Sequence, residues 1–192
     1  DGYVGKPVEL GTDVFTMDVA GSTSPAFDSG FPVDFALVKN PSSTDSWDVA
    51  ARLIQNQNLK PTSAAQSTYT SNKFDYNSSW LDNTSYNGIQ SWMWKRGQGC
   101  DIITYTGNGT AGRPISHSLN QVPEMIWVKK RNDTSNWTVY NKGFNGGTNP
   151  EQYYLHLDES VAENTGSDKW NDTAPTSTHF TIGNSNSVNE NT

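Results

Sequence analysis

Apolar residues occur along this chain in short bursts, separated by stretches rich in Asn, Ser, Thr, Gly and Asp. The bursts contain many β-branched and aromatic residues, and turn-forming residues bound each one, which is typical of β-strands in a sandwich or barrel. Helical periodicity is weak, and no alternation of strands and helices indicates a doubly wound nucleotide-binding fold. We therefore predict an all-β protein with a single turn of helix at residues 50–54. The bursts lie at residues 14–17, 35–38, 102–105, 125–128, 137–140 and 153–155.

The chain contains an internal repeat. Residues 34–40 and 124–130 each consist of an acidic residue, four apolar residues and a lysine, at an offset of 90. The same offset relates residues 46–49 to 136–139, whereas an offset of 88 relates 14–16 to 102–104. Matches in one order, with insertions confined to turn-rich stretches, indicate two copies of one β-domain.

The repeat predicts two tandem antiparallel β-sandwiches. The first spans residues 1–96 and begins with an N-terminal extension at residues 1–12, and the second spans residues 97–192. Gly97 and Gly99 flank the expected joint, since glycine-rich stretches interrupt regular structure. Each copy is long enough to bury a modest core.

The second copy ends differently from the first. Residues 74–77 match residues 180–183 at an offset of 106, and the first copy then continues into a closing strand at residues 89–96. No counterpart of this strand is present before Thr192, so the second copy is expected to lack it. A missing core strand leaves apolar surface and backbone groups without partners. Two explanations stay open: the natural chain continues past Thr192, which we favour, or a strand from another chain fills the gap. In the latter case, residues 3–10 are a candidate donor strand.

Composition excludes several classes of function. The 192 residues carry a net charge of -7, which disfavours binding to a nucleic-acid backbone. No apolar run is long enough to span a membrane. Aromatic residues make up 11% of the chain, which argues against disorder. A single cysteine excludes a disulfide framework and a zinc site built on several cysteines.

Motifs for catalysis and metal binding are missing from the sequence. The histidines, His117, His156 and His179, have no partner at metal-ligand spacing. No Gly-x-Ser-x-Gly elbow is present, and the glycine-rich residues 107–112 are best explained as a hairpin turn. Paired carboxylates of a glycan-cleaving enzyme cannot be recognised from sequence, because such a pair is defined by its separation in space. We expect no catalytic residue and no metal ligand.

The tryptophans divide into core and binding candidates. Trp47 and Trp137 occupy the same repeat position, each two residues before a valine, and are predicted to be equivalent core residues. Trp92 and Trp94 share one face of the closing strand and are predicted to cap the core of the first copy. Trp80 and Trp170 lie in turn-rich segments and are the candidates for stacking on sugar rings. The strand-end lysines, Lys39 and Lys129, are expected to be solvated.

Several segments resemble one family of modules. In the second copy these are residues 101–113, 116–119, 122–125, 127–131, 143–153 and 170–176, and in the first copy residues 30–35 and 90–96. They are similar to tandem concanavalin A-like, LamG-like jelly-roll modules found in virion structural and tail-fibre proteins of marine phages, especially cyanophages. The resemblance covers nearly the whole chain and includes no catalytic motif. It implies a jelly-roll-like fold, a virion or extracellular appendage, and a buried, unreactive Cys100.

These observations predict a non-enzymatic structural module of a phage fibre or virion surface appendage, acting as a rigid spacer or assembly unit. Its expected partners are further copies of itself or other virion and fibre subunits. No cofactor is expected. Calcium is the open alternative, because concanavalin A-like relatives sometimes bind it at a sandwich edge, and the acidic segments considered for it are 82–88, 28–30, Asp168 and Asp172. Two other functions stay open: an adhesin that binds a host-surface glycan, and a cell-surface filament assembled by donor-strand exchange.

Overall fold

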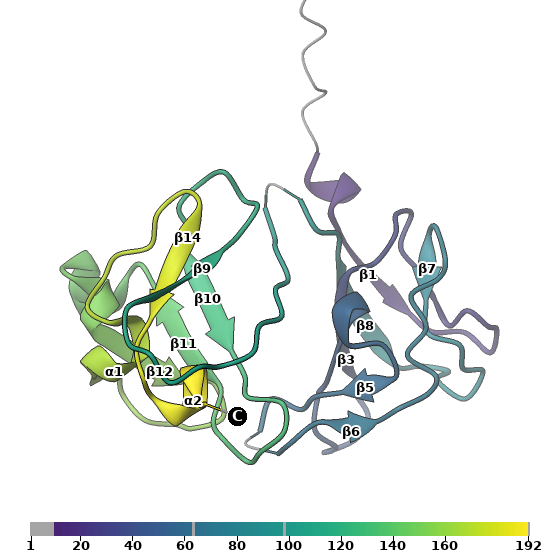
Figure 1. The fold of residues 1–192 in the computed structure, drawn as a ribbon. Helices are drawn as coiled ribbons and strands as arrows, with labels where there is room; N and C mark the ends of the chain where they lie inside the picture. The colour runs from purple at the N-terminus through teal and green to yellow at the C-terminus, as the bar shows by residue number, and fades with distance from the viewer. Residues whose placement is uncertain (1–9, 63, 98, 192) are drawn as a thin grey trace, which may run out of the picture.

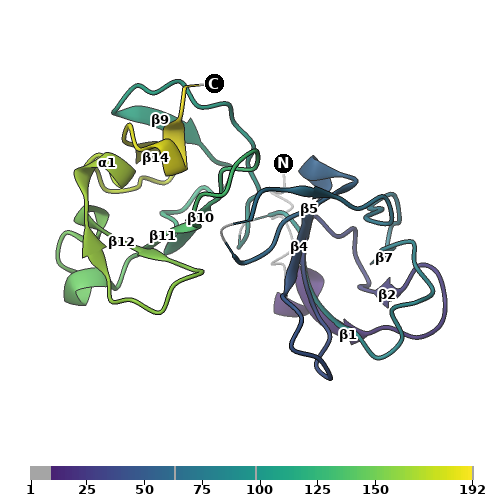
Figure 2. The same cartoon turned by 90° about the horizontal axis from the view of Figure 1, so that it is seen from below.

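The computed structural model describes residues 10–62, 64–97 and 99–191. The fold is all-β, as predicted: the strands form antiparallel sheets, and the helices are single turns (Figure 1). Two lobes lie side by side, and every strand pair between described residues stays within one lobe (Figures 1 and 2). No helix in the described part of the chain is long and apolar enough to cross a membrane.

The first lobe, residues 10–97, is built on a four-stranded sheet in the order β1-β8-β3-β4. Its strands are β1 (Phe15–Val19), β2 (Phe27–Asp28), β3 (Phe35–Lys39), β4 (Asp48–Ala51), β5 (Gln57–Asn58), β6 (Ser67–Thr68), β7 (Ser79–Trp80) and β8 (Gln90–Trp94). The short strands pair as β2-β7 and β5-β6, and the 3₁₀ helices are η1 (Gly11–Asp13) and η2 (Arg52–Ile54).

The alternation of buried and partly exposed side chains along β3 and β8 shows where the core of the first lobe lies. In β3, Ala36 and Val38 are buried, and in β8, Ser91 and Met93 are fully buried. These side chains face the β2-β7 pair, because successive residues of a strand point to opposite faces. The result is a two-layered sandwich core between the four-stranded sheet and β2-β7.

The second lobe, residues 99–191, contains a four-stranded sheet in the order β10-β11-β12-β13 and a separate β9-β14 pair. Its strands are β9 (Arg113–Ser116), β10 (Met125–Val128), β11 (Thr138–Asn141), β12 (Tyr153–His156), β13 (Asn164–Thr165) and β14 (His179–Ile182). Single helical turns connect them: η3 (Phe144–Gly147), η4 (Pro150–Gln152), α1 (Ser167–Trp170) and α2 (Asn186–Asn189). The core again lies between the two layers.

One hairpin has the same register in both lobes. Phe35 pairs with Ala51 in β3-β4, and Met125 pairs with Asn141 in β10-β11, which is the same register at an offset of 90. The hairpin loops share a further contact: the Nζ atoms of Lys39 and Lys129 each donate to a loop carbonyl four residues on, both over 3.0 Å. These lysines therefore stabilise hairpin loops, and the expectation that they are merely solvated was wrong.

Strand pairing corrects the sequence match at the end of the repeat. Trp80 of β7 pairs with Phe27, and Phe180 of β14 pairs with Ile115. Because Phe27 and Ile115 are 88 positions apart, as are 14–16 and 102–104, Phe180 corresponds to Trp80 at an offset of 100. The predicted match of Phe74 with Phe180 was therefore wrong by six residues.

Two other local expectations can be compared with the structure. The helical turn expected at residues 50–54 is η2, which covers only Arg52–Ile54, because Ala50 and Ala51 belong to β4. Gln98 of the joint and residues 3–9 of the proposed donor strand lie outside the described residues. The asparagines between the strands serve the turns at Asn145 and Asn149, which adopt the left-handed conformation that asparagine tolerates.

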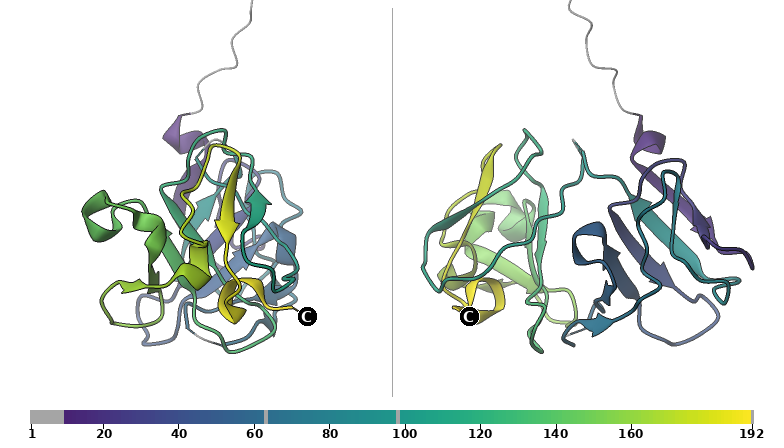
Figure 3. Two further views of the ribbon diagram at one scale, coloured as in Figure 1. Left: turned by 60° about the vertical axis from the view of Figure 1, so that its left-hand side comes forward. Right: turned by 45° about the vertical axis from the view of Figure 1, so that its right-hand side comes forward.

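An apolar cluster joins the two lobes. Val49, Ala51, Ile54 and Leu59 of the first lobe pack with Trp137 of the second. Hydrogen bonds cross the same junction: Trp137 Nε1–H donates to the Lys60 carbonyl over 2.7 Å, and the backbone amide of Gln66 donates to the Arg131 carbonyl over 2.7 Å. The Arg131 guanidinium donates in turn to Gln66 Oε1 over 3.4 Å. A buried contact therefore joins the two lobes, which lie next to each other (Figure 3).

Candidate functional site

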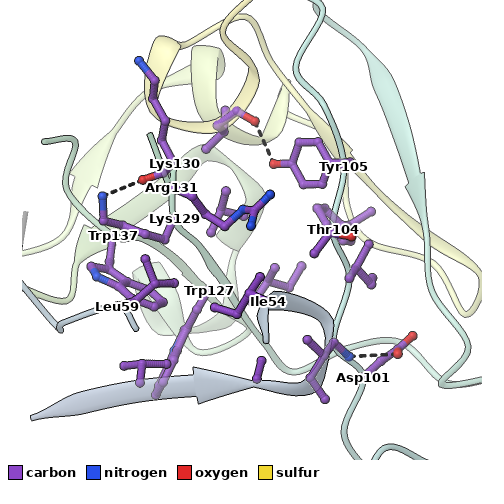
Figure 4. Close-up of a pocket in the computed structure, with 18 of the residues that line it drawn as sticks. Ile54, Leu59, Asp101, Thr104, Tyr105, Trp127, Lys129, Lys130, Arg131 and Trp137 are labelled. Atoms are coloured by element: carbon purple, nitrogen blue, oxygen red, sulfur yellow. Dashed lines mark hydrogen bonds between the residues drawn. The ribbon is translucent and has the colours of Figure 1, made fainter. Parts of the chain in front are cut away.

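A cavity of about 670 Å³ lies at the junction between the lobes. Mostly apolar side chains line it, and the close-up shows them converging from both lobes (Figure 4). They include Ile54 and Leu59 of the first lobe and Ile103, Tyr105, Trp127 and Val128 of the second. The size and the apolar lining are those of a binding site for a ligand or a peptide.

Two stretches of extended chain form the walls of the cavity on the second lobe: residues 102–107 and β10. Ile103 and Tyr105 on one wall, and Ile126 and Val128 on the other, pack against the core of the second lobe. Ile102 points the opposite way and packs against the junction cluster. We call the groove between these two walls the slot.

The first lobe shows what normally lies between such walls. There β8 lies between β1 and β3, pairing Met93 with Thr16 on one side and with Ala36 on the other. Residues 102–107 take the place of β1 in the order along the chain, and β10 corresponds to β3 at an offset of 90. On the first wall the residue-by-residue match at an offset of 88 does not hold, because Ile103 and Tyr105 face the core whereas Phe15 and Met17 lie on the outer face of β1. In the second lobe β10 is an edge strand, and within the described residues no strand lies between these walls.

The backbone along the slot lacks ladder partners. No backbone hydrogen bond among the described residues joins 102–107 to β10. In the first lobe, by contrast, the Asp34 amide donates to the Trp94 carbonyl, so the equivalent Glu124 is where such a bond would form in the second. Two facing edges without partners can accept the amides and carbonyls of one added strand.

One end of the slot is held by the segment after β14. Asn189 is 1% exposed, and its Nδ2 donates to the carbonyls of Thr110 and Gly183, each over 2.8 Å. Its Oδ1 accepts the Asn108 amide over 2.9 Å. Asn189 therefore ties this segment to residues 108–110, which directly follow the wall formed by residues 102–107.

The next residue, Glu190, lies between the two walls at the mouth of the slot. A Cβ atom added to Gly107 would lie 2.0 Å from the Glu190 carbonyl oxygen, so the close approach of the two backbones requires glycine here. On the other side, the Glu190 carboxylate forms an ion pair with Lys130. The hydrogen bonds from Lys130 to Asp133 and Glu190 raise the pKa of its amine.

The other end of the slot begins at Asp101. Its carboxylate accepts the Ile102 amide (2.9 Å), the Ser118 amide (2.7 Å) and the Ser118 hydroxyl (3.0 Å), and it pairs with Arg96 of the first lobe. Burial opposes ionisation, but the bonds from Ser118 and Arg96 outweigh it and hold the pKa of this carboxyl below its usual value. Asp101 therefore anchors the wall where the lobes join.

This carboxylate gives a pH-dependent prediction. Because the pKa of Asp101 is lower in the folded than in the unfolded chain, its contribution to stability is complete above the unfolded pKa of about 3.9 and is lost as pH falls through the folded value. Asp101→Asn should therefore flatten the acid limb of the free energy of unfolding, measured by urea titration at a series of pH values. Asp13→Asn, at the equivalent and exposed position of the first lobe, is the control. Parallel acid limbs for Asp101→Asn and the unmodified chain would show that Asp101 has no such role.

A protein-family model matches residues 93–192, which is more than half of the chain. Its description is "Domain of unknown function (DUF7483)". The chain belongs to this family. No curated protein and no solved structure matches it. The DUF7483 match covers the whole second lobe, with both walls of the slot, and it begins at Met93 inside β8.

The two sugar-binding candidates are buried in this structure, so that prediction was wrong. Trp80 is 1% exposed; it packs between Phe27 and Phe74, and its Nε1–H donates to the Ser91 hydroxyl over 3.2 Å. Trp170 is 2% exposed and packs edge-on against Tyr140. Their turn-rich surroundings suggested exposure, but β7 and α1 turn both rings into the cores of their lobes.

The predicted core tryptophans behave differently from one another. Trp137 is 4% exposed because the first lobe covers it, whereas Trp47 is 38% exposed and stacks on Trp92 at 4.8 Å. Trp92 and Trp94 are half-buried on the outer face of the sheet, so they do not cap the core; Met93 points inward between them. The prediction held for Trp137 and was wrong for Trp47, Trp92 and Trp94. In this DUF7483 protein, Trp47 is thus an exposed ring that stacks on the half-buried Trp92.

The other candidates contribute to local structure. His156 contacts Glu159 and Asn136, His117 contacts the Thr176 carbonyl, and His179 contacts Thr176. No group of three or more potential metal ligands occurs among the described residues, and calcium binding stays untested. Cys100 is half-buried, and burial raises the pKa of its thiol to about 11, which makes the thiolate scarce at neutral pH.

Sequence reasoning did not locate the slot residues. Gly107, Asn189 and Glu190 carry no recognisable motif, and the misplaced match at Phe180 hid the correspondence of Glu190 with Gln90. The expectation that the second copy lacks a closing strand was the signal in the sequence that pointed to this region.

Proposed function

We propose that this chain is a non-enzymatic structural module that serves as a rigid spacer or assembly unit in a phage fibre or virion surface appendage. The junction between the lobes carries this proposal. Trp137 and four apolar residues of the first lobe form a buried cluster there, and hydrogen bonds from Trp137 and Gln66 cross it. Lobes joined by a buried apolar contact keep a fixed orientation, which a spacer requires.

The internal repetition supports the same proposal. The hairpins β3-β4 and β10-β11 have one register at an offset of 90, and the pairs β2-β7 and β9-β14 correspond in the same order. Tandem copies of one sandwich, each in contact with its neighbour, build extended and regular structures. The resemblance to virion structural and tail-fibre modules supplies the setting, and the partners are further copies of this module or other fibre subunits.

Immunogold electron microscopy with antibodies against the purified chain tests this function. We expect label at regular positions on fibres or on the surface of virus particles from the natural source. Pre-immune serum, and antibody absorbed with the purified chain, are the controls. Label restricted to the interior of cells, with particles and appendages unlabelled, would contradict the proposal.

A further inference from the structure

The slot in the second lobe has the form of a β-sheet from which one strand has been left out. Both of its walls are extended, both present backbone groups without ladder partners, and apolar side chains line the space between them. We infer that the slot binds one antiparallel β-strand of the β8 type, which enters in continuity with Glu190. This inference holds whether or not the chain is a fibre module.

The first lobe supplies the template for the occupant. There β8 completes the sheet between β1 and β3, and the side chains of Ser91 and Met93 point into the core while Trp92 and Trp94 point outward. A strand in the slot would likewise place its second and fourth side chains against the core around Val128 and its third and fifth toward the first lobe. The expected occupant therefore has a small residue at its second position and an apolar residue at its fourth.

The register at the mouth of the slot decides where the strand enters. In the first lobe Gln90, the first residue of β8, pairs with Val19. In the second lobe the backbone of Glu190, 100 positions after Gln90, closely approaches the backbone of Gly107 at the end of the first wall. Glu190 thus already occupies the first position of the missing strand, held there by the hydrogen bonds of Asn189 and the ion pair with Lys130.

The limits of the family match agree with a strand of this kind. The part of the chain that matches the DUF7483 model begins at Met93, inside β8. A strand of the β8 type therefore lies where the matched part begins. The donor segment at residues 3–10 is a poorer occupant: Pro7 lies in its middle, and proline cannot donate to the ladder of a strand that is paired on both sides.

The test adds the strand to the protein. In the grafted chain, the sequence of residues 91–96 follows Glu190 in place of Asn191 and Thr192. The matched control carries the same graft with proline as its third residue, which removes one backbone donor in the middle of the strand. Hydrogen exchange of the amides of residues 103–107 and 125–128 is the readout, because ladder formation protects these amides directly.

We expect the graft to slow exchange at both walls by an order of magnitude or more and to raise the midpoint of thermal unfolding. The proline graft should leave both unchanged. Unchanged exchange in the grafted chain would overturn the inference, and so would equal protection by the proline graft, because an apolar tail would then suffice.

A separate peptide with the sequence of residues 90–96, added at equimolar concentration to the unmodified chain, distinguishes the source of the strand. We expect no protection from it, because a tethered strand acts at a far higher effective concentration. Protection by the free peptide but not by the graft would overturn the continuity with Glu190 and make the slot a docking site for another chain.

Discussion

Replacing Trp137 with alanine is expected to lower the free energy of unfolding by about 3–5 kcal/mol, the usual cost of deleting a buried aromatic side chain. Trp137 is 4% exposed, packs with four buried residues of the first lobe, and donates its indole N–H to Lys60. Its loss leaves a cavity between the lobes and removes a hydrogen bond that joins them. Urea unfolding followed by tryptophan fluorescence and circular dichroism measures the loss.

Trp47→Ala is the matched control, because Trp47 occupies the same repeat position and is 38% exposed. Its removal costs only the stacking on Trp92, within about 1 kcal/mol. Trp137→Ala should also release the lobes from one another, so that limited proteolysis cuts faster near the joint between them. Equal losses for the two variants, with no change in proteolysis, would show that the junction does not hold the lobes together.

Asn189→Ala is expected to lower the free energy of unfolding by about 2–3 kcal/mol. Its buried partners would lose their hydrogen bonds to protein and would not regain hydrogen bonds to water. The side chain of Asn189 is satisfied by Thr110 and Gly183 as acceptors and by the Asn108 amide as donor. All three partners lie on loops, and an alanine side chain cannot form hydrogen bonds with any of them. Chemical unfolding gives the loss, and hydrogen exchange of the Asn108 and Gly109 amides shows whether the segment has left the wall.

Asn191→Ala provides the control, since this neighbouring asparagine is exposed. It should change the free energy of unfolding by no more than about 0.5 kcal/mol. A loss at Asn189 as small as that at Asn191 would mean that the segment entering the slot is not anchored by this side chain.

The sequence by itself determined the fold class and predicted one hairpin register that recurs at an offset of 90. Short bursts of β-branched and aromatic residues bounded by turn residues reflect local preferences, so they located β3, β10 and β11. The offset of 90 then related β3 to β10 and β4 to β11. The strand bursts and the scarcity of helical periodicity identified an all-β protein for the same local reason. Comparing one copy with the other also drew attention to the region beside β10, where the described residues form no further strand.

Only the tertiary structure decided the environment of the tryptophans and the position of the slot. Trp47 and Trp137 share one local pattern, but the first lobe covers one of them and leaves the other open, and no local pattern records which face meets a neighbour. Trp80 and Trp170 have loop-like sequences and buried rings, because burial depends on the layer packed above them. The place of Glu190 at the mouth of the slot became visible only through its approach to Gly107, a contact between positions 83 residues apart in the chain.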